Sequence, residues 1–417
     1  MQTKIKTEME PDINNNGHWF NRNVLGMGLT SFLSDASHEM ATSVLPGFLA
    51  TIGAPASALG IIEGLSDAVA SFVKLWSGWF SDKLGHRKIF ATAGYFLTGI
   101  SKALFAFAYT WHLVLIGRTL AWLGRGFRGP IRDAMLSDSV DPKVRGKAFG
   151  FHRAGDTLGA ILGPLLGVWF LSLWQNGHNL SDQSLPFRNI FLLTLIPGIL
   201  SALMFAFMVV EKRRRPNRDL KFWGTVRSLP PGFRKFLYGV GIFGIGDFAP
   251  TLLILAATYL LSPEYGTVKA AQIAGLMYVV RNVTYAAASY PIGALSDKIE
   301  RRILLAFGYL LAFITIGGFI ASFILNFANI YYLFFLFALA GIYIAAEDTL
   351  EGAITADYIH TDTRGIGMGV LGTVNGIGDF IASAVTGLLW TSFSPAVGFG
   401  FAALMMLVGF IVLLSAS

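Results

Sequence analysis

GWFSDKLGHRK at residues 78–88 is a short charged turn between two long apolar stretches. A weaker copy, GALSDKIERR, follows at residues 293–302, about half a chain later. The first copy reads Gly-x-x-x-Asp-Lys-x-Gly and then three basic residues, whereas the second has Glu300 in place of the last glycine. A basic turn that joins two apolar segments once in each half predicts a membrane protein built from two related units. The departure at Glu300 favours the first copy as the working one.

The composition is that of an integral membrane protein. Hydrophobic residues make up 54% of the 417 residues, charged residues only 14%, and the mean hydropathy is +0.58. About twelve apolar segments have the roughly 20 residues needed to cross a hydrocarbon core of roughly 30 Å. The sequence therefore predicts an all-α membrane protein with twelve transmembrane helices in two six-helix repeats. We expect these helices at residues 18–50, 56–82, 88–108, 112–138, 143–174, 187–211, 232–262, 268–295, 301–325, 329–358, 363–392 and 395–415.

The basic residues follow the topology of such a chain. Most of the 32 Lys and Arg lie in the amino terminus and in alternate loops, while the other loops hold only Arg188 and Lys269. The positive-inside rule then places both termini and the basic loops in the cytoplasm. We expect a multi-pass protein of the plasma (inner) membrane, and no binding of nucleic acid, because topology accounts for the pI near 9.5. The expected units are a cytoplasmic tail at 1–17, a six-helix bundle at 18–211, a cytoplasmic linker at 212–231 and a second bundle at 232–417.

The two halves have the pattern of copies of one unit. When residue n is compared with residue n + 219, Asp138 matches Asp357 and the Arg-Gly pair at 145–146 matches that at 364–365. The same offset pairs two arginines with acids, so that two positions have inverted their charge between the halves. These pairs are Arg128 with Glu347 and Arg132 with Glu351.

Charged side chains inside the apolar segments are the main functional signal. An ionisable group at bilayer depth must face protein or a water-filled cavity. The fourth predicted helix carries four arginines at steps of seven, three and four, which share one helical face. By symmetry this face meets two acids one turn apart on the tenth helix. Either the charges pair to hold the bundle together, or one or two guanidinium groups are left to meet an anionic substrate. The expected substrate-binding residues are Arg125, Arg128, Arg132, Glu347, Glu351, Asp35 and Arg281.

Carboxylates next to histidine or arginine are the candidates for proton coupling. Asp35 and Glu39 lie one turn apart on the first helix, and Asp156 lies one turn from His152 on the fifth. A carboxylate beside such a group can release and take up a proton as access to the cavity alternates. The alternative is a satisfied ion pair between helices. We expect at least one of Asp35, Glu39 and Asp156 to carry the proton, with Asp247, Arg281 and Asp379 as further candidates.

The turn at 78–88 resembles the loop between helices 2 and 3 of the major facilitator superfamily of transporters, and the resemblance covers residues 18–415. Gly159-x-x-x-Gly163-Pro164-x-x-Gly167 resembles the antiporter motif of its drug-exporting branches, and Arg118 resembles a buried arginine that these exporters use in proton coupling. The resemblance implies a substrate site near the membrane midplane between the halves. It also implies a cytoplasmic gate formed by Asp82, Arg87, Asp138, Arg145, Gly163 and Pro164.

These features predict a secondary transporter that moves a small organic solute by alternating access. The arginine face favours an anionic or zwitterionic solute, for example a carboxylate metabolite or a polycarboxylate metal chelator, and the motif in the fifth helix favours proton-coupled efflux. A multidrug/proton antiporter for lipophilic compounds is the alternative. No nucleotide-binding motif is present to supply energy in another way. An enzyme or a non-transporting sensor is disfavoured, because no Ser-His-Asp set, His-rich metal site or output domain stands out in the sequence. We expect no cofactor or metal, a monomer in the lipid bilayer, and a small-molecule substrate and protons as partners.

Overall fold

The computed structural model of the chain describes residues 19–84, 87–141, 144–176, 182–211, 229–296, 298–359 and 364–415, except for the side chains of residues 75, 78–84, 146, 175–176 and 364–366. The elements in these ranges are all helices. Those of the first half are α1 (Arg22–Thr51), α2 (Ala56–Leu84), α3 (Lys88–Ser101), η1 (Lys102–Phe107), α4 (Trp111–Asp138), α5 (Arg145–Asn176), α6 (Leu185–Leu193) and α7 (Leu195–Met208). Those of the second half are α9 (Pro231–Gly244), α10 (Pro250–Tyr265), α11 (Thr267–Leu295), α12 (Arg301–Leu325), α13 (Ile330–Tyr358), α14 (Arg364–Ser392) and α15 (Pro395–Ser415).

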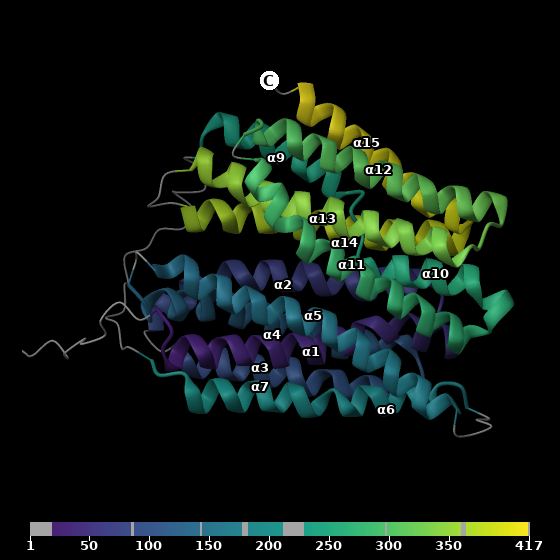
Figure 1. Cartoon of the computed structure of the whole chain (residues 1–417), viewed down its shortest axis with the longest axis horizontal. Helices are drawn as coiled ribbons and strands as arrows, with labels where there is room; N and C mark the ends of the chain where they lie inside the picture. The colour runs from purple at the N-terminus through teal and green to yellow at the C-terminus, as the bar shows by residue number, and fades with distance from the viewer. Residues whose placement is uncertain are drawn as a thin grey trace, which may run out of the picture.

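The helices form two bundles that lie side by side with their axes roughly parallel (Figure 1). The first bundle contains α1–α7 and the second contains α9–α15. When α3 is counted with η1, α6 with α7 and α9 with α10, each bundle has six long segments, so the predicted all-α fold of twelve helices in two repeats is confirmed. Most of the predicted linker, residues 212–228, lies outside the described residues, and the boundaries of the units remain a prediction.

One predicted helix, at residues 232–262, is interrupted where it meets the centre of the protein. α9 ends at Gly244 and α10 begins at Pro250, where proline is well suited because the first turn of a helix has no partner for that N–H. The backbone of the break is hydrogen-bonded to α14 of the same bundle, since the N–H of Ala249 donates to Ser383 Oγ at 2.9 Å. The break brings the acid Asp247 into an irregular segment between two half-helices.

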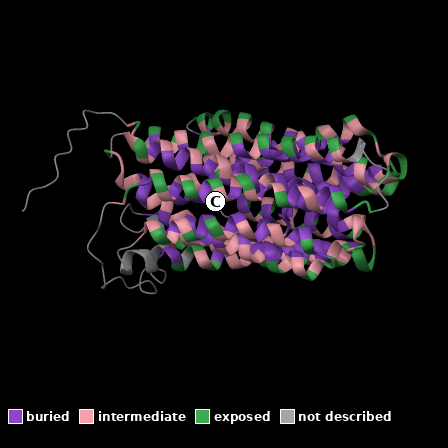
Figure 2. Cartoon of the chain, turned by 90° about the horizontal axis from the view of Figure 1, so that it is seen from below, coloured by how far each residue is buried: buried purple, intermediate pink, exposed green. Residues whose placement is uncertain are grey.

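The outer surface of the two bundles is largely apolar, as a lipid environment requires. Large apolar side chains such as Trp76, Phe207 and Tyr331 are 71–84% exposed, and exposed and half-buried residues run along the length of the bundles (Figure 2). Within the described residues, eight helices are long and apolar enough to cross a membrane by length and composition. The segments that miss this criterion are α1, α4, α9 with α10, and α11. All four contribute side chains, many of them charged, to the central cavity described below.

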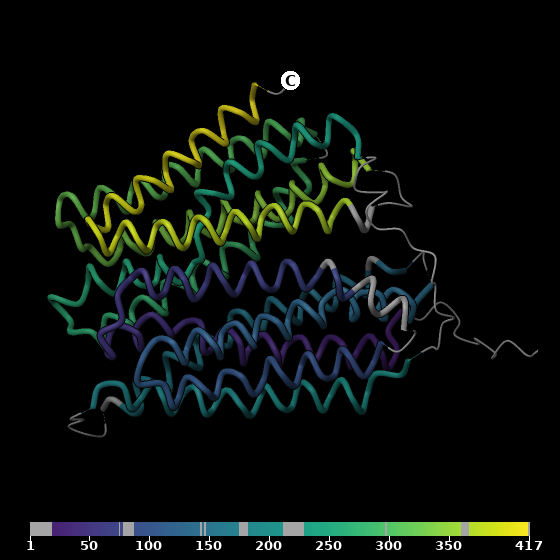
Figure 3. The backbone as a smooth tube through the Cα atoms, turned by 180° about the vertical axis from the view of Figure 1, so that it is seen from behind, coloured from purple at the N-terminus to yellow at the C-terminus, as the bar shows by residue number. Residues whose placement is uncertain are grey.

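The bundles pack tightly against each other at the end that carries the α1–α2 and α14–α15 turns. A Cβ on Gly60 would lie 2.2 Å from the carbonyl oxygen of Ser383, so the backbones of α2 and α14 touch there. The backbone N–H of Ser57 donates to Thr391 Oγ1 at 2.9 Å. At the same end the turn between α10 and α11 lies against the first bundle (Figure 3), and a Cβ on Gly47 would lie 2.5 Å from Ala271 Cβ. We call this set of contacts the end seal.

Candidate functional site

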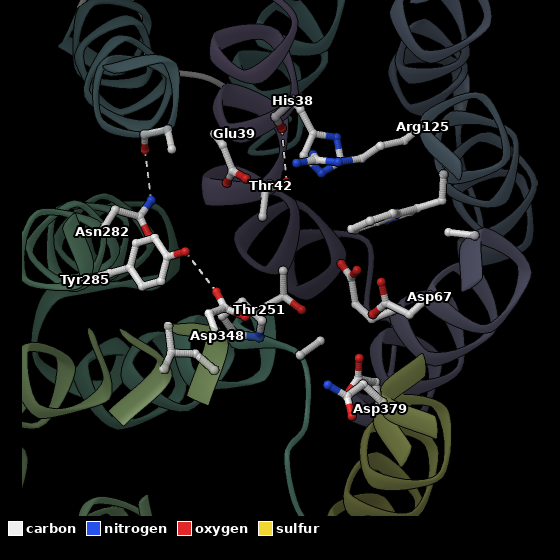
Figure 4. Close-up of a pocket in the computed structure, with 18 of the residues that line it drawn as sticks. His38, Glu39, Thr42, Asp67, Arg125, Thr251, Asn282, Tyr285, Asp348 and Asp379 are labelled. Carbon is white, nitrogen blue, oxygen red and sulfur yellow. Dashed lines mark hydrogen bonds between the residues drawn. The ribbon is translucent and has the colours of Figure 1, made fainter. Parts of the chain in front are cut away.

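A cavity of about 530 Å³ lies between the two bundles near the middle of the long helices. α1, α2, α4 and α5 line it from the first bundle, and the α9–α10 break, α11, α13 and α14 line it from the second (Figure 4). Thr42 of α1 and Glu63 of α2 line the cavity, and Gly47 and Gly60 follow toward the helix ends, where each meets the other bundle. The cavity is therefore covered on the side of the end seal.

Arg118 of α4 forms a buried ion pair with Glu63 of α2. Its Nε and Nη2 donate to Glu63 Oε2 at 3.1 and 2.9 Å, and its Nη1 donates to Thr42 Oγ1 at 3.1 Å. Both side chains are only 2% exposed. A guanidinium group held by two helices in this way stabilises the wall of the cavity, and most of its donors are already used.

Arg125 is the cation of α4 that faces the open part of the cavity. Its side chain is 30% exposed and its Nη2 lies 3.6 Å from Asp35 Oδ1. The guanidinium also lies 5.3 Å from the centre of the Trp122 ring, within reach of a cation–π interaction. Arg125 thus retains donors for a solute while Asp35 and Trp122 hold it in position.

Arg128 and Arg132, which the sequence predicts to bind substrate, lie outside the lining of this cavity. Arg128 is 2% exposed, donates to Ser34 Oγ at 2.9 Å and lies over the Tyr95 ring at 4.1 Å. At roughly 100° per residue Arg128 points about 80° away from Arg118, so it meets α3. Arg132 lies about 10 Å beyond Arg125 along the helix and pairs with Asp133 at 2.8 Å. The shared face predicted from spacing is therefore too broad to open onto one cavity.

The three predicted proton carriers, Asp35, Glu39 and Asp156, all line the cavity. Glu39 Oε2 accepts a hydrogen bond of 2.8 Å from Tyr278 of the second bundle, so this contact joins the two halves. Asp156 Oδ2 lies 3.5 Å from His152 Nδ1. The other ring nitrogen of His152 contacts Ser31 Oγ of α1 at 2.7 Å.

The second bundle presents an acidic wall to the cavity, formed by Asp247, Glu347, Asp348 and Asp379. Arg281 is the one Lys or Arg of this bundle among the described lining residues. Tyr343 approaches Asp247 at 3.5 Å, and Tyr285 donates to Asp348 at 2.8 Å (Figure 4). Across the whole lining, nine Asp or Glu face five Lys or Arg. The lining is therefore acidic in sum, contrary to the basic site that the arginine face predicts.

Glu351, also predicted to bind substrate, lies behind this wall and outside the lining. Its Oε1 accepts from Tyr309 at 2.6 Å and its Oε2 from Asn375 at 2.7 Å. Asn375 itself lines the cavity. Glu351 is thus placed to orient Asn375.

The predicted gate residues all belong to the first bundle. Arg87 Nη1 forms an ion pair with Asp138 Oδ2 at 2.9 Å, and Arg145 Nε donates to the carbonyl of Ser137 at 3.1 Å. The second bundle repeats the first of these pairs, with Arg301 Nη1 at 2.8 Å from Asp357 Oδ2. The side chain of the predicted gate residue Asp82 lies outside the described residues.

The glycine-rich face of α5 packs directly on α1. A Cβ on Gly159 would lie 2.6 Å from the carbonyl oxygen of Phe32, and one on Gly163 would lie 2.5 Å from that of Ala36. Pro164 follows within the same continuous helix. This close approach joins two helices of the same bundle.

Two polar features of the protein interior were missed by the sequence reasoning. Lys102 is fully buried in η1 and its Nζ donates to Ser37 Oγ at 2.5 Å. A charged residue in an apolar stretch was the available signal for it. The tyrosines Tyr278, Tyr285 and Tyr343 also line the cavity, but tyrosine is too common in membrane helices for sequence to single them out. No group of three or more His, Cys, Asp or Glu in the described part of the chain is arranged to hold a metal ion.

Comparisons with known proteins agree with the fold. A family model described as Major Facilitator Superfamily matches residues 27–269 and 248–416. An uncharacterised MFS-type transporter of Methanocaldococcus jannaschii is 33% identical over 415 residues, which are 99% of this chain and 100% of that protein. A multidrug resistance protein B homologue of Mycobacterium tuberculosis is 27% identical over 164 residues, which are 39% of this chain and 28% of that protein.

Solved structures of transporters share the architecture. A bacterial homologue of the human lysosomal transporter Spinster, in an inward-facing unoccupied conformation, superposes with a TM-score of 0.71 at 17% identity and with 96% of each chain covered. A nucleoside transporter superposes with a TM-score of 0.77 at 12% identity, covering 95% of this chain and 100% of that one. At these identities the likeness concerns the fold alone.

Proposed function

Because this chain belongs to the Major Facilitator Superfamily and is a transporter rather than an enzyme, we propose that it exports a small charged organic solute in exchange for protons. The observation that carries this proposal is the cavity between the bundles, in which Arg125 on one wall faces the acidic wall on the other. A guanidinium group with unused donors opposite a wall of carboxylates suits a zwitterion better than a plain anion. The resemblance of the Gly159–Gly167 segment to an antiporter motif supports export.

The proposed topology follows from the distribution of basic residues. Both termini and the linker at 212–231 are cytoplasmic in this proposal, the end seal is external, and the cavity is reached from the cytoplasm. Since the chain has no cysteine, single cysteines at Ser57, Ser394 and Asn217 can be labelled with an impermeant maleimide in intact cells. We expect labelling at residues 57 and 394 and protection at 217. The reverse pattern would invert the topology.

Proton coupling is assigned to at least one of Asp35, Glu39 and Asp156. The carboxylates of all three face the cavity and none is committed to a close Lys or Arg pair shorter than 3.5 Å among the described residues. Each can therefore change protonation as the cavity opens to either side. In this proposal the solute and the proton occupy the cavity in turn.

In proteoliposomes, an Asn or Gln at the coupling position should abolish transport driven by a pH gradient and spare solute exchange, because exchange requires no net proton movement. The solute would be taken from a thermal-shift screen of amino acids, diamines, dicarboxylates and cationic dyes, since a ligand that binds the native state raises apparent stability. Asp182→Asn, in an exposed loop, is the matched control. Gradient-driven transport that survives all three single changes would remove these acids from the mechanism.

Multidrug/proton antiport remains the second candidate, supported by the partial similarity to a multidrug resistance homologue. Such an exporter needs a mainly apolar cavity for lipophilic compounds. The 14 ionisable Asp, Glu, Lys and Arg that line this cavity disfavour that reading. Stabilisation by a cationic dye such as ethidium, with no response to the polar solutes in the same screen, would favour it.

A further inference from the structure

We infer that the acidic wall is a binding site for an ammonium or guanidinium group of the solute, with Glu347 and Asp247 as its carboxylate ligands. This inference rests on the proposed transport function and names the class of solute: an organic amine that also carries a carboxylate. Of the anionic and zwitterionic solutes predicted from the arginine face, it selects the zwitterionic ones. In the second bundle, the four acids among the described lining residues are not balanced by the single cation there, Arg281.

The four carboxylates of the acidic wall lack cationic partners. Among the described residues, none of Asp247, Glu347, Asp348 and Asp379 takes part in an ion pair. Arg281, the cation of this bundle in the lining, is hydrogen-bonded to Asn282 at 3.1 Å and lies 5.6 Å from the Tyr278 ring. By contrast, Glu63 and Asp35 of the first bundle each meet an arginine.

Glu347 carries the clearest sign of a missing partner. The residue is 8% exposed and lines the cavity, yet its buried Oε2 has no hydrogen-bond partner. Its neighbour in the wall, Asp247, is 9% exposed, lies within hydrogen-bond reach of the Glu347 carboxyl group and is 3.5 Å from Tyr343, so two acidic side chains meet here. Burying a carboxylate without a partner is costly, and a cation that enters the cavity removes that cost.

The surroundings favour an organic cation over a metal ion. The described side chains form no group of three or more metal-binding residues, and about 530 Å³ is far more space than one ion fills. Phe248, Tyr278 and Tyr343 line the same space, and aromatic rings attract ammonium and guanidinium groups through their faces. Carboxylates with aromatic rings beside them are thus suited to hold a desolvated amine.

Arg125 supplies the other end of the site. It lies across the cavity from Asp348 (Figure 4), and its half-buried guanidinium is held at 3.6 Å from Asp35. A carboxylate on the solute would meet Arg125 while its amine meets the acidic wall. The two walls belong to different bundles, so one solute with both charges would contact both halves.

The test compares three homologous series of four to six carbons, which differ only in their end groups: diamines such as putrescine, amino acids such as 4-aminobutyrate, and dicarboxylates such as succinate. Binding to the purified full-length protein is measured by calorimetry at one pH. We expect the amine-bearing series to bind and the dicarboxylates not to bind. Glu347→Gln should weaken binding of both amine-bearing series at least tenfold.

Arg125→Gln is the matched variant on the opposite wall. It should weaken binding of the amino acids and not that of the diamines, because the second ammonium group of a diamine gains nothing from Arg125, whereas Asp182→Asn should change nothing. Dicarboxylate binding without amine binding, no binding of any amine, or an unchanged amine affinity in Glu347→Gln would each overturn the inference. Proton-coupled transport of a solute without an amine would defeat the amine site and leave the proposed function standing, while the absence of any transport in proteoliposomes would defeat the proposed function itself.

Discussion

Arg118→Leu is expected to destabilise the protein by about 3–5 kcal/mol, because it leaves Glu63 as a buried charge without its partner. The pair is 2% exposed on both sides and joins α2 to α4, with a further hydrogen bond to Thr42 of α1. Glu63→Leu should lower the stability by a similar amount, since it leaves the guanidinium group of Arg118 buried without its carboxylate partner. The measurement is the thermal unfolding midpoint of each purified variant, with transport assayed in parallel.

The double variant Arg118→Met with Glu63→Leu separates structure from mechanism. Apolar residues that fill the same space often restore most of the stability lost when one buried partner is removed. We expect the double variant to unfold close to the wild-type temperature and to transport nothing, if Arg118 has the coupling role that its resemblance implies. Full transport by the double variant would make the pair purely structural. A single Arg118→Leu variant with wild-type stability would contradict the buried pair itself.

Gly60→Ala is expected to open the end seal. The new Cβ would lie 2.2 Å from the carbonyl oxygen of Ser383, which is backbone and cannot rotate away. Overpacking of this kind costs roughly 1–3 kcal/mol, and only in the state whose end seal is closed. A free-energy difference of that size between the conformations with a closed and an open end seal changes the ratio of their populations by roughly 5- to 150-fold. We therefore expect the conformations open at this end to gain population, and gradient-driven transport to fall.

Spin labels on cysteines introduced at Ala54, in the α1–α2 turn, and at Ser394, in the α14–α15 turn, report the distance between the two bundles at the end seal. The distance distribution should shift to longer values in Gly60→Ala. Gly317→Ala is the control, because a Cβ there meets no atom within 4 Å. An unchanged distance distribution in a correctly inserted Gly60→Ala protein would contradict this prediction, because it would show that α2 and α14 accommodate the methyl group without a change in the conformational equilibrium.

The positions of the arginines of α4 illustrate how far sequence alone reaches. Spacing correctly indicated that Arg118, Arg125, Arg128 and Arg132 lie toward one side of the helix. It could not indicate that this side is divided among three neighbours: the cavity, α3 through Tyr95, and the adjacent Asp133. A helical face spans about 100°, and its contacts depend on which helices pack against it.

In the second bundle, too, the sequence could not predict which charged groups reach the cavity. The break between α9 and α10 is one example. Asp247 was only a secondary candidate in the sequence, because the apolar segment at 232–262 reads as one helix. Packing of the freed backbone against Ser383, more than a hundred residues later, allows the break and carries Asp247 into the cavity. Glu347 gains its significance only in the folded protein, where its buried Oε2 has no hydrogen-bond partner.

The sequence by itself determined that this chain is an all-helical membrane protein of twelve segments in two related halves, because segment length, apolar composition and the turn at 78–88 are local properties that each stretch carries wherever it packs. Only the tertiary structure decided which charges meet. Arg118 and Glu63 lie 55 residues apart, and Glu39 and Tyr278 lie 239 apart. In a bilayer each buried charge is stabilised by whichever group the neighbouring helices bring to it, and that neighbour is a property of the packed bundles.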